Sequence, residues 1–177
     1  MTETSAIHLR QIVPSDLDAI IRLSLLAWEP VFDSFRRVLG EDIFLQIYPD
    51  WPRDQERAVR GQCTNASSVT WLAETDLVVT GFVSWEVNEV SKIGEVHMLA
   101  VHPDHQRQGI GGRLNELALV AFKDAGMTLA VVGTGGDPGH APARRSYERA
   151  GYTALPIVRY YKTLTDHVVE VGSSPQF

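Results

Sequence analysis

Apolar residues recur every three or four positions between Gly109 and Ala125, with mostly polar residues and glycines between them. The apolar positions are Ile110, Leu114, Leu117, Ala118, Ala121 and Phe122. This period predicts an amphipathic helix with one face on a protein core, and Gly126 is a typical residue to end it.

Two further helical regions are predicted in the first third of the chain. Pro14-Ser15-Asp16 is typical of a helix start, and apolar residues follow it at positions 17, 20, 21 and 25. The region from Trp28 to Cys63 is also helical in pattern and rich in aromatic residues, and it is interrupted by Pro49 and Pro52.

Shorter apolar runs predict strands. They lie at residues 7–12, 69–74, 77–86, 93–101, 128–133 and 157–164. A turn at Thr75-Asp76 favours a hairpin between the second and third of these strands. A last helix is predicted over 142–150, ended by Gly151. The order of elements indicates an α+β fold, a mixed sheet with helices on both faces.

Composition narrows the functional classes. The chain has 177 residues, 44% of them hydrophobic and 21% charged, which is typical of one soluble domain over residues 1–177. The net charge of −6 argues against a general nucleic-acid binder, because neutralising phosphates requires a basic face. No apolar run reaches the roughly 20 residues that cross a bilayer, and residues 1–5 lack the features of a signal peptide. We therefore expect a cytoplasmic protein without membrane or nucleic-acid partners.

Cysteine and metal chemistry add little. Cys63 is the lone cysteine, so it cannot form a disulfide within the chain. It is more typical of a buried bystander thiol than of a nucleophile. No His, Cys and Asp residues are grouped at metal-ligand spacing, and no metal is expected.

A glycine-rich loop precedes the clearest helix. A helix start carries unpaired N–H groups and a partial positive charge, so it attracts anions. Gly109, Gly111 and Gly112 leave the backbone bare, and Arg107 and Arg113 add positive charge, with His105 nearby. The loop lacks the Gly-Lys-Ser/Thr of a nucleotide P-loop and the third glycine of a dinucleotide fingerprint. The expected chemistry is a pyrophosphate cradle; the alternative is a glycine-rich turn that only starts a helix.

The sequence at this point resembles the GNAT superfamily of N-acetyltransferases. Residues 106–111, Gln-Arg-Gln-Gly-Ile-Gly, match every fixed position of the family motif Gln/Arg-x-x-Gly-x-Gly/Ala. Upstream, residues 95–103 resemble the family's fourth strand. Downstream, residues 143–152 resemble its closing Ala-x-x-x-Tyr-x-x-x-Gly-Phe/Tyr helix, and 159–162 its last strand. The resemblance covers about residues 69–164, leaving 165–177 as an uninformative tail.

The resemblance implies a mostly antiparallel central sheet in an α/β/α sandwich, with acetyl-CoA as co-substrate and no metal. It also implies which residues bind that co-substrate: Leu99, Ala100, Val101, Gln106, Arg107, Gln108, Gly109, Ile110, Gly111, Gly112, Arg113, His140, Ala143 and Tyr147. His140 departs from the family, since many relatives carry Asn there. An imidazole at this position can hydrogen-bond the cofactor arm, transfer a proton, or simply cap the next helix.

Acetyl transfer to an amine requires that the amine lose a proton, and an alkyl amine has a pKa near 10.4 in water. By resemblance, Glu95 is the first candidate for the base; the alternative for it is an exposed or ion-paired carboxylate. His97 is the competing base, with a packing histidine as its alternative, and loss of the proton to water alone is also left open. By strand alternation, Glu95, His97 and Leu99 are expected on one face, at least until any bulge. Tyr147 resembles the family's general acid, with a core tyrosine as the alternative. The family's oxyanion donor is a free strand N–H near Leu99, while Val101 pairs with the pantetheine arm.

The expected reaction is direct attack of a primary amine on acetyl-CoA within a ternary complex. A small-molecule acceptor is expected, contacting Trp28, Phe32 and Glu95, although the aromatic residues can equally be core. A protein lysine or N-terminus is the alternative acceptor, and a longer acyl donor is not excluded. A non-catalytic sensor or scaffold that binds coenzyme A is the alternative function. The sequence also leaves a homodimer open.

Overall fold

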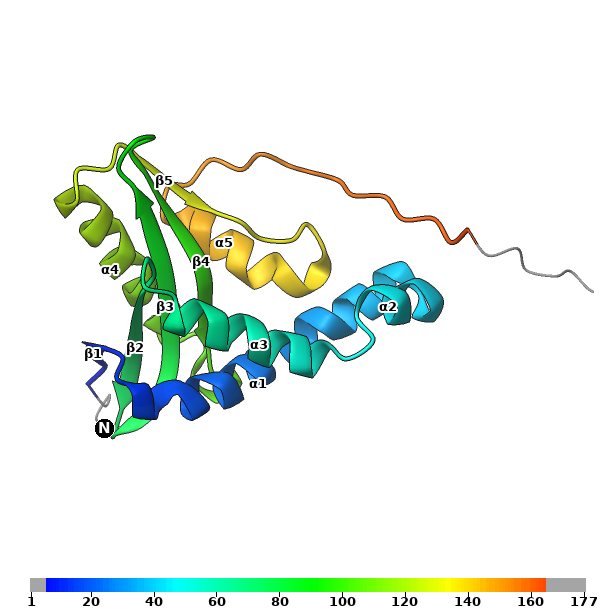
Figure 1. Ribbon diagram of the computed structural model, residues 1–177, viewed down its shortest axis with the longest axis horizontal. Helices are drawn as coiled ribbons and strands as arrows, with labels where there is room; N and C mark the ends of the chain where they lie inside the picture. Colours follow the sequence, from blue (N-terminus) through cyan, green and yellow to red (C-terminus); the bar gives the residue numbers. More distant parts are fainter. Residues whose placement is uncertain (1–5, 165–177) are drawn as a thin grey trace, which may run out of the picture.

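The computed structural model describes residues 6–164 (Figure 1). The elements, in chain order, are β1 (His8–Gln11), η1 (Pro14–Asp16), α1 (Leu17–Leu39), α2 (Glu41–Ile47), α3 (Trp51–Thr64), β2 (Val69–Thr75), β3 (Val78–Asn88), β4 (Ile93–Val101), η2 (Pro103–His105), α4 (Ile110–Asp124), β5 (Leu129–Val132), η3 (Pro138–His140) and α5 (Ala141–Arg149). Residues 1–5 and the tail expected at 165–177 lie outside the described residues.

The five strands form one sheet in the order β1-β2-β3-β4-β5. The first three pairings are antiparallel, and β4 pairs with β5 in parallel. The parallel step needs a crossover, which α4 supplies. The expected mixed and mostly antiparallel sheet is therefore confirmed.

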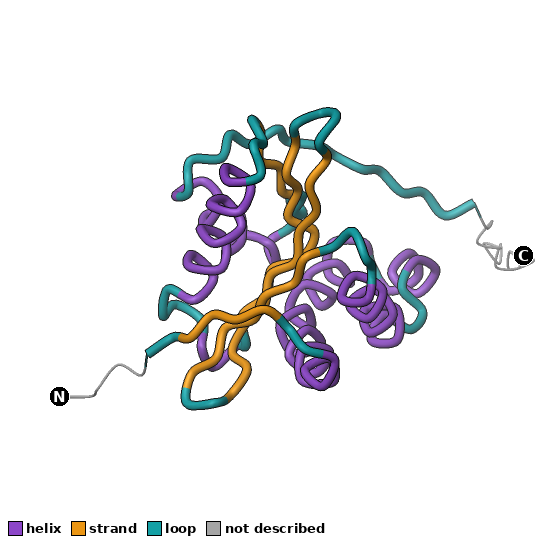
Figure 2. The backbone as a smooth tube through the Cα atoms, turned by 60° about the vertical axis from the view of Figure 1, so that its left-hand side comes forward, coloured by secondary structure: helices purple, strands orange, loops and turns teal. Residues whose placement is uncertain are grey.

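Helices cover both faces of this sheet, as Figure 2 shows with the strands in orange. The stripe of α4 packs on one face, where Leu114 and Phe122 are buried against Val83, Trp85 and Val96 of the strands. On the other face, α1 and α3 bury a second cluster that consists of Ile20, Ile21, Leu23, Val59, Leu72, Phe82 and Ala100. The predicted sandwich of helices around a sheet is confirmed.

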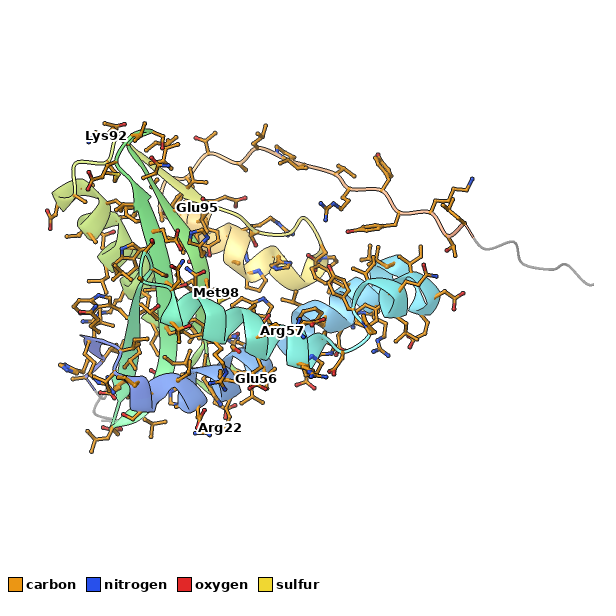
Figure 3. The ribbon with its side chains drawn as sticks, viewed as in Figure 1. Arg22, Glu56, Arg57, Lys92, Glu95 and Met98 are labelled. Carbon is orange, nitrogen blue, oxygen red and sulfur yellow. The ribbon has the colours of Figure 1, made fainter. Side chains whose placement is uncertain are left out.

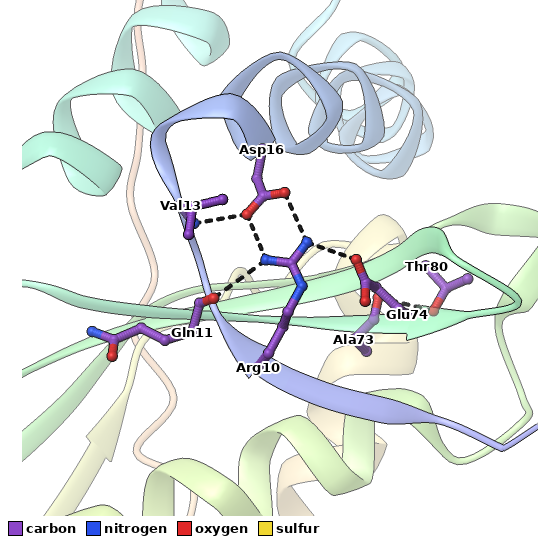
Figure 4. A network of polar contacts seen from close by, with 7 residues as sticks. All are labelled: Arg10, Gln11, Val13, Asp16, Ala73, Glu74 and Thr80. Atoms are coloured by element: carbon purple, nitrogen blue, oxygen red, sulfur yellow. Dashed lines mark hydrogen bonds and ion pairs between the residues drawn. The ribbon is translucent and has the colours of Figure 1, made fainter.

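A charged network ties the first strand to the sheet (Figure 4). Arg10 of β1 donates to both carboxylate oxygens of Asp16, at 2.7 and 2.8 Å, and to Glu74 of β2 at 2.6 Å. The hydrogen bonds from Arg10 lower the pKa of Asp16; burial opposes the shift, and the N–H of Val13 adds to it. Asp16 also begins α1, so the network joins that helix to two strands.

The first helix is longer than the sequence predicts. A new helical region was expected from Trp28, whereas α1 runs unbroken from Leu17 to Leu39 with Pro30 inside it. Val31 and Phe32, directly after the proline, are buried on the same side as the earlier apolar residues. Burial of that continuous apolar stripe outweighs the hydrogen bond that Pro30 cannot donate.

The strand predicted over 157–164 is wrong. This segment is extended but not assigned to any strand, and no strand among residues 6–164 pairs with it. Ile157, Val158 and Tyr160 are 80%, 69% and 89% exposed. Figure 1 shows the segment, in orange, running away from the sheet. Its apolar pattern is suited to a strand, but a strand forms only where a partner supplies hydrogen bonds.

Among the described residues, no helix combines the length and the apolar character needed to cross a membrane.

Candidate active site

A cavity of about 490 Å³ opens where β4 and β5 separate. The ladder between these strands runs from the pair Ile93–Leu129 to the pair Val96–Val132 and then ends. Strand β4 continues alone to Val101, and the gap beside it is lined by the loop before α4, by η3 and α5, and by part of α1. The sheet itself thus creates a slot between two parallel strands.

A bulge in β4 decides which side chains face the slot. Ser84 of β3 pairs with Met98 and Trp85 pairs with Val96, so His97 is the extra residue. Val96 packs on the α4 face, and beyond the bulge it is Leu99 that packs there, while Met98 packs toward α1 and α3. Figure 3 labels Met98 beside α3. Glu95 and Leu99 therefore lie on opposite faces, because the bulge that the expectation allowed for falls at His97 and reverses the alternation.

The backbone of β4 beyond the bulge offers free hydrogen-bonding groups. The N–H of His102 donates to Thr80 of β3 at 2.9 Å. By the antiparallel alternation, the N–H groups of Leu99 and Val101 then point away from β3, toward the slot. The carbonyl of Val101 accepts a hydrogen bond from Gln106 at 3.2 Å. A free N–H at Leu99 is what the sequence resemblance requires of an oxyanion donor.

The start of α4 faces the same cavity. Its first intrahelical bond runs from the N–H of Arg113 to the carbonyl of Gly109 at 3.1 Å, so the amides of residues 110–112 have no such partner. Arg107 and Gly109 have φ of 62° and 84°, which turns the loop tightly into the helix. A Cβ added to Gly112 would meet nothing within 4 Å, so the backbone there is open to a ligand.

The structure brings together most of the residues predicted to hold the co-substrate. The cavity is lined by Leu99, Ala100, Val101, Gln106, Arg107, Gly109, Ile110, Gly111, Gly112, His140, Ala143 and Tyr147. Gln108 and Arg113 are exposed and do not line it; the amide of Gln108 donates to the carbonyl of Asp104 at 3.3 Å.

The three predicted catalytic side chains are placed differently from one another. Tyr147 lines the cavity, its hydroxyl has no hydrogen-bond partner among the described residues, and burial raises its pKa to about 12. His97 also lines the cavity and lies 3.8 Å from a carboxylate oxygen of Glu86. Glu95, labelled in Figure 3, is exposed. It pairs across the sheet with Glu86 and does not line the cavity.

The aromatic residues predicted for the acceptor separate into two groups. Trp28 lines the cavity. Phe32 is only 9% exposed and packs on Trp51 and Tyr48, with ring centroids 4.4 and 5.4 Å away. Of the two, Trp28 is thus the one placed to contact a ligand.

Sequence reasoning missed Asp137 and Ser34. The carboxylate of Asp137 lies 2.5 Å from Nδ1 of His140, and the hydroxyl of Ser34 accepts from the N–H of Gly139 at 2.9 Å. An Asp three residues before a His is a weak local signal for the first contact. Nothing in the sequence indicates the second, since Ser34 belongs to α1. Within residues 6–164, no group of three or more His, Cys, Asp or Glu side chains is arranged to hold a metal ion.

Three features meet at this cavity: the opening between β4 and β5, the unpaired edge of β4, and the glycine-rich start of α4. Together they are typical of an acetyltransferase domain that uses a coenzyme A thioester. Residues 31–152, more than half of the chain, match the model of the Acetyltransferase (GNAT) family, and the chain belongs to this family. The resemblance that the motifs indicated is confirmed. Members of the family use acetyl-CoA as co-substrate.

Individual relatives are more distant. A mycothiol acetyltransferase of Thermomonospora curvata is 28% identical over 117 residues, which is 66% of this chain and 38% of that protein. The chain thus spans well under half of the length of this curated relative. A GNAT-family acetyltransferase structure from Desulfovibrio desulfuricans has a TM-score of 0.66 at 21% identity, covering 87% of this chain and 89% of its own. The aminoglycoside N-acetyltransferase AAC(6')-Iy in complex with CoA has a TM-score of 0.63 at 14% identity, covering 93% and 99%. These two likenesses concern the fold.

Proposed function

We propose that the protein transfers the acetyl group of acetyl-CoA to a primary amine by direct attack in a ternary complex. The observation that carries this proposal is the slot beside β4, where the free N–H of Leu99, the bare amides of α4 and the hydroxyl of Tyr147 face one cavity. Each is a group that acetyl transfer needs, for the carbonyl oxygen, the pyrophosphate and the leaving sulfur respectively.

The residues of the slot fit coenzyme A. The amides of residues 110–112 and the guanidinium of Arg107 suit a pyrophosphate, because a helix start and a cation both favour an anion. The open backbone at Gly112 leaves room for phosphate oxygens. The free edge of β4 at Leu99 and Val101 suits the amide groups of a pantetheine arm, which would pair with it as a short strand does. Bound there, acetyl-CoA supplies the activated acetyl group.

The chain's own groups then perform three tasks. The N–H of Leu99 hydrogen-bonds the carbonyl oxygen as negative charge develops on it; such a donor is typically worth about 3 kcal/mol in the transition state. The hydroxyl of Tyr147 donates to the departing sulfur. The proton of the amine goes to a base, for which His97 and His140 line the cavity whereas Glu95 lies outside it.

We propose a small-molecule acceptor. The cavity continues past Trp28 and Val31 of α1, which give it an apolar wall. The related mycothiol acetyltransferase and the structurally similar aminoglycoside acetyltransferase carry small molecules in their names. Acetylation of a protein lysine or N-terminus is the competing proposal, and a homodimer is a further one that light scattering can test.

The test is a panel of amines and peptides with acetyl-CoA, read by release of free thiol. A matched pair of variants reports on the cradle. Gly112→Leu adds a side chain where the structure is open and the backbone unstrained, so folding is retained while the space for a phosphate is filled. We expect coenzyme A affinity to fall more than about tenfold, equal to about 1.4 kcal/mol. Gly61→Leu on α3, equally open and far from the cavity, is the control.

Unchanged coenzyme A affinity in Gly112→Leu contradicts the cradle. Tight coenzyme A binding without acetylation of any amine in the panel contradicts the enzyme and favours the sensor.

A further inference from the structure

A buried carboxylate and a histidine stand together at the mouth of the cavity. Oδ1 of Asp137 lies 2.5 Å from Nδ1 of His140, and the two side chains are only 8% and 18% exposed. Oδ2 of the same carboxylate accepts from the N–H of Gly139 at 2.9 Å. Both carboxylate oxygens are therefore engaged, one of them by the imidazole.

Helix α1 supports this pair from the other side. The buried hydroxyl of Ser34 accepts from the N–H of Gly139 at 2.9 Å and helps to lower the pKa of Asp137. The ring of Phe35 lies 5.6 Å from the imidazole, centroid to centroid. Residues 105 positions apart in the chain thus hold the carboxylate and the ring in place.

Two glycines are necessary for this packing. A Cβ on Gly135 would stand 2.5 Å from both Oδ1 of Asp137 and Nδ1 of His140. A Cβ on Gly139 would stand 2.8 Å from Cβ of Ser34 and 3.0 Å from Cα of Val31. The 2.5 and 2.8 Å distances are shorter than real Cβ contacts, so a side chain at Gly135 would displace the pair, and one at Gly139 would push the segment away from α1.

The geometry selects one tautomer of the imidazole. Burial acts to raise the pKa of Asp137, but hydrogen bonds from Ser34 and His140 outweigh it, and the net pKa is lowered. The ionised carboxylate only accepts, so Nδ1 of a neutral His140 carries the hydrogen and Nε2 carries the lone pair. His140 lines the cavity, and Nε2 has no hydrogen-bond partner among the residues that the structure describes.

We propose that Asp137 is a positioning residue that orients His140, and that Nε2 of His140 accepts the proton of the acceptor amine. This role rests on the acetyl transfer proposed above. The amine nitrogen forms a bond to the carbonyl carbon, and the carbon–sulfur bond breaks. The amine proton moves to Nε2 of His140 and from there to water, while the sulfur departs as a thiolate that accepts a hydrogen bond from the hydroxyl of Tyr147 and then takes a proton from water.

The other charged and titratable groups around the pair come from two helices. Arg144 of α5 donates to the carbonyls of Gly135 and Asp137, which fixes the loop and leaves the carboxylate to the imidazole. Burial is the main cause that raises the pKa of Tyr48, at the end of α2, with smaller contributions from Tyr161 and from the charge of Asp137, while Arg159 lowers it. From α1 the pair meets Ser34 and Phe35, neither of which carries a charge.

Asp137 also caps η3 through Gly139, so a purely structural role must be distinguished from positioning. Asp137→Asn keeps an oxygen for that cap but presents an amide that can donate to Nδ1. We expect it to fold, and to shift His140 toward the opposite tautomer with hydrogen on Nε2. Ser34→Ala removes one support of the same carboxylate and is expected to give a partial shift.

The first experiment reads the tautomer without any substrate. Nitrogen-15 NMR of the ring nitrogens is recorded in the free protein across neutral pH, with His140→Gln identifying the signal. The proposal expects hydrogen on Nδ1 in the parent protein and its loss in Asp137→Asn. Hydrogen on Nε2 in the parent, or an unchanged spectrum in Asp137→Asn, overturns the positioning role.

The second experiment is the pH dependence of kcat/KM with a good acceptor. We expect His140→Gln to lose the acidic limb of this pH profile and to slow at neutral pH by on the order of 10²-fold or more. Asp137→Asn should lower kcat by about tenfold or more through the wrong tautomer. Glu95→Gln and His97→Gln should keep the acidic limb of the kcat/KM profile.

The outcomes separate the two proposals. If the parent acetylates amines and His140→Gln keeps both rate and limb, the proton acceptor is another group and this inference fails while the acetyltransferase stands. If the parent acetylates no amine in the panel, the proposed function fails and the base role of His140 with it. In that case the NMR result still decides whether Asp137 orients the ring.

Discussion

Removal of one hydroxyl at Tyr147 is the sharpest test of how the leaving sulfur is stabilised. The ring stands on α5, packs edge-on against Tyr152 with centroids 5.7 Å apart, and lines the cavity. Tyr147→Phe keeps this packing, and the hydroxyl has no partner within the described part of the chain that would be left unpaired. The variant therefore changes what a ligand meets and little else.

The magnitude follows from the raised pKa. Burial holds the pKa of Tyr147 at about 12, whereas an ordinary thiol has a pKa near 8.5. The difference of about 3.5 makes complete proton transfer from phenol to thiolate uphill by about 5 kcal/mol in the free protein, at 1.36 kcal/mol for each pKa unit. The principal contribution of Tyr147 is then a hydrogen bond to a charged sulfur, worth about 1.5–3 kcal/mol. We expect kcat to fall by about 10- to 150-fold.

The pH profile carries a second expectation. Because burial raises the pKa, the phenol stays protonated below about pH 12, and its ionisation should cause no alkaline fall in rate between neutral pH and pH 10. The assay is steady-state thiol release over this range, with calorimetry to show unchanged coenzyme A affinity. Tyr152→Phe, which loses a hydrogen bond to Asn115 outside the cavity, is the control. A kcat within twofold of the parent refutes the role of Tyr147.

Two predictions concern stability. A Cβ on Gly94 would lie 2.4 Å from the ring of Phe122, so Gly94→Ala should lower the free energy of unfolding in urea by about 1–3 kcal/mol. Phe122→Leu should relieve part of that loss; strictly additive effects would contradict the contact. Asp16→Asn should cost about 2 kcal/mol at pH 7 by breaking the bonds from Arg10. Folding lowers the pKa of Asp16, so its ionised carboxylate stabilises the fold above the unfolded pKa of about 3.9, and this stabilisation is lost as the pH falls further. The difference in unfolding free energy between Asp16→Asn and the parent should therefore shrink near pH 3. An equal difference at pH 7 and pH 3 would refute the role of the carboxylate charge.

Local patterns predicted much of the fold. The apolar stripe over 110–122 predicted α4 correctly, the runs over 69–74 and 77–86 predicted the hairpin of β2 and β3, and the run over 93–101 predicted β4. These elements depend on periodicity and turn residues, which are properties of neighbouring positions. Prediction failed where formation depends on a distant partner. Residues 157–164 have the composition of a strand and remain unpaired, and α1 continues past Pro30 because a core lies beneath it.

By itself, the sequence determined the family and predicted where the proposed co-substrate cradle lies. A glycine-rich turn entering a helix is a local device, since unpaired amides and bare backbone arise wherever such a segment forms. Residues 106–112 are recognisable for that reason without any knowledge of the rest of the chain.

Only the tertiary structure decided which side chains line the cavity. The bulge at His97 reverses the alternation of β4, and the ladder that ends at Val96 opens the slot; neither can be read from the strand's composition. Ser34, which accepts a hydrogen bond from Gly139 between Asp137 and His140, is remote from them in the chain. A contact between distant residues is set by how whole elements pack, and packing is a property of the assembled core rather than of any segment.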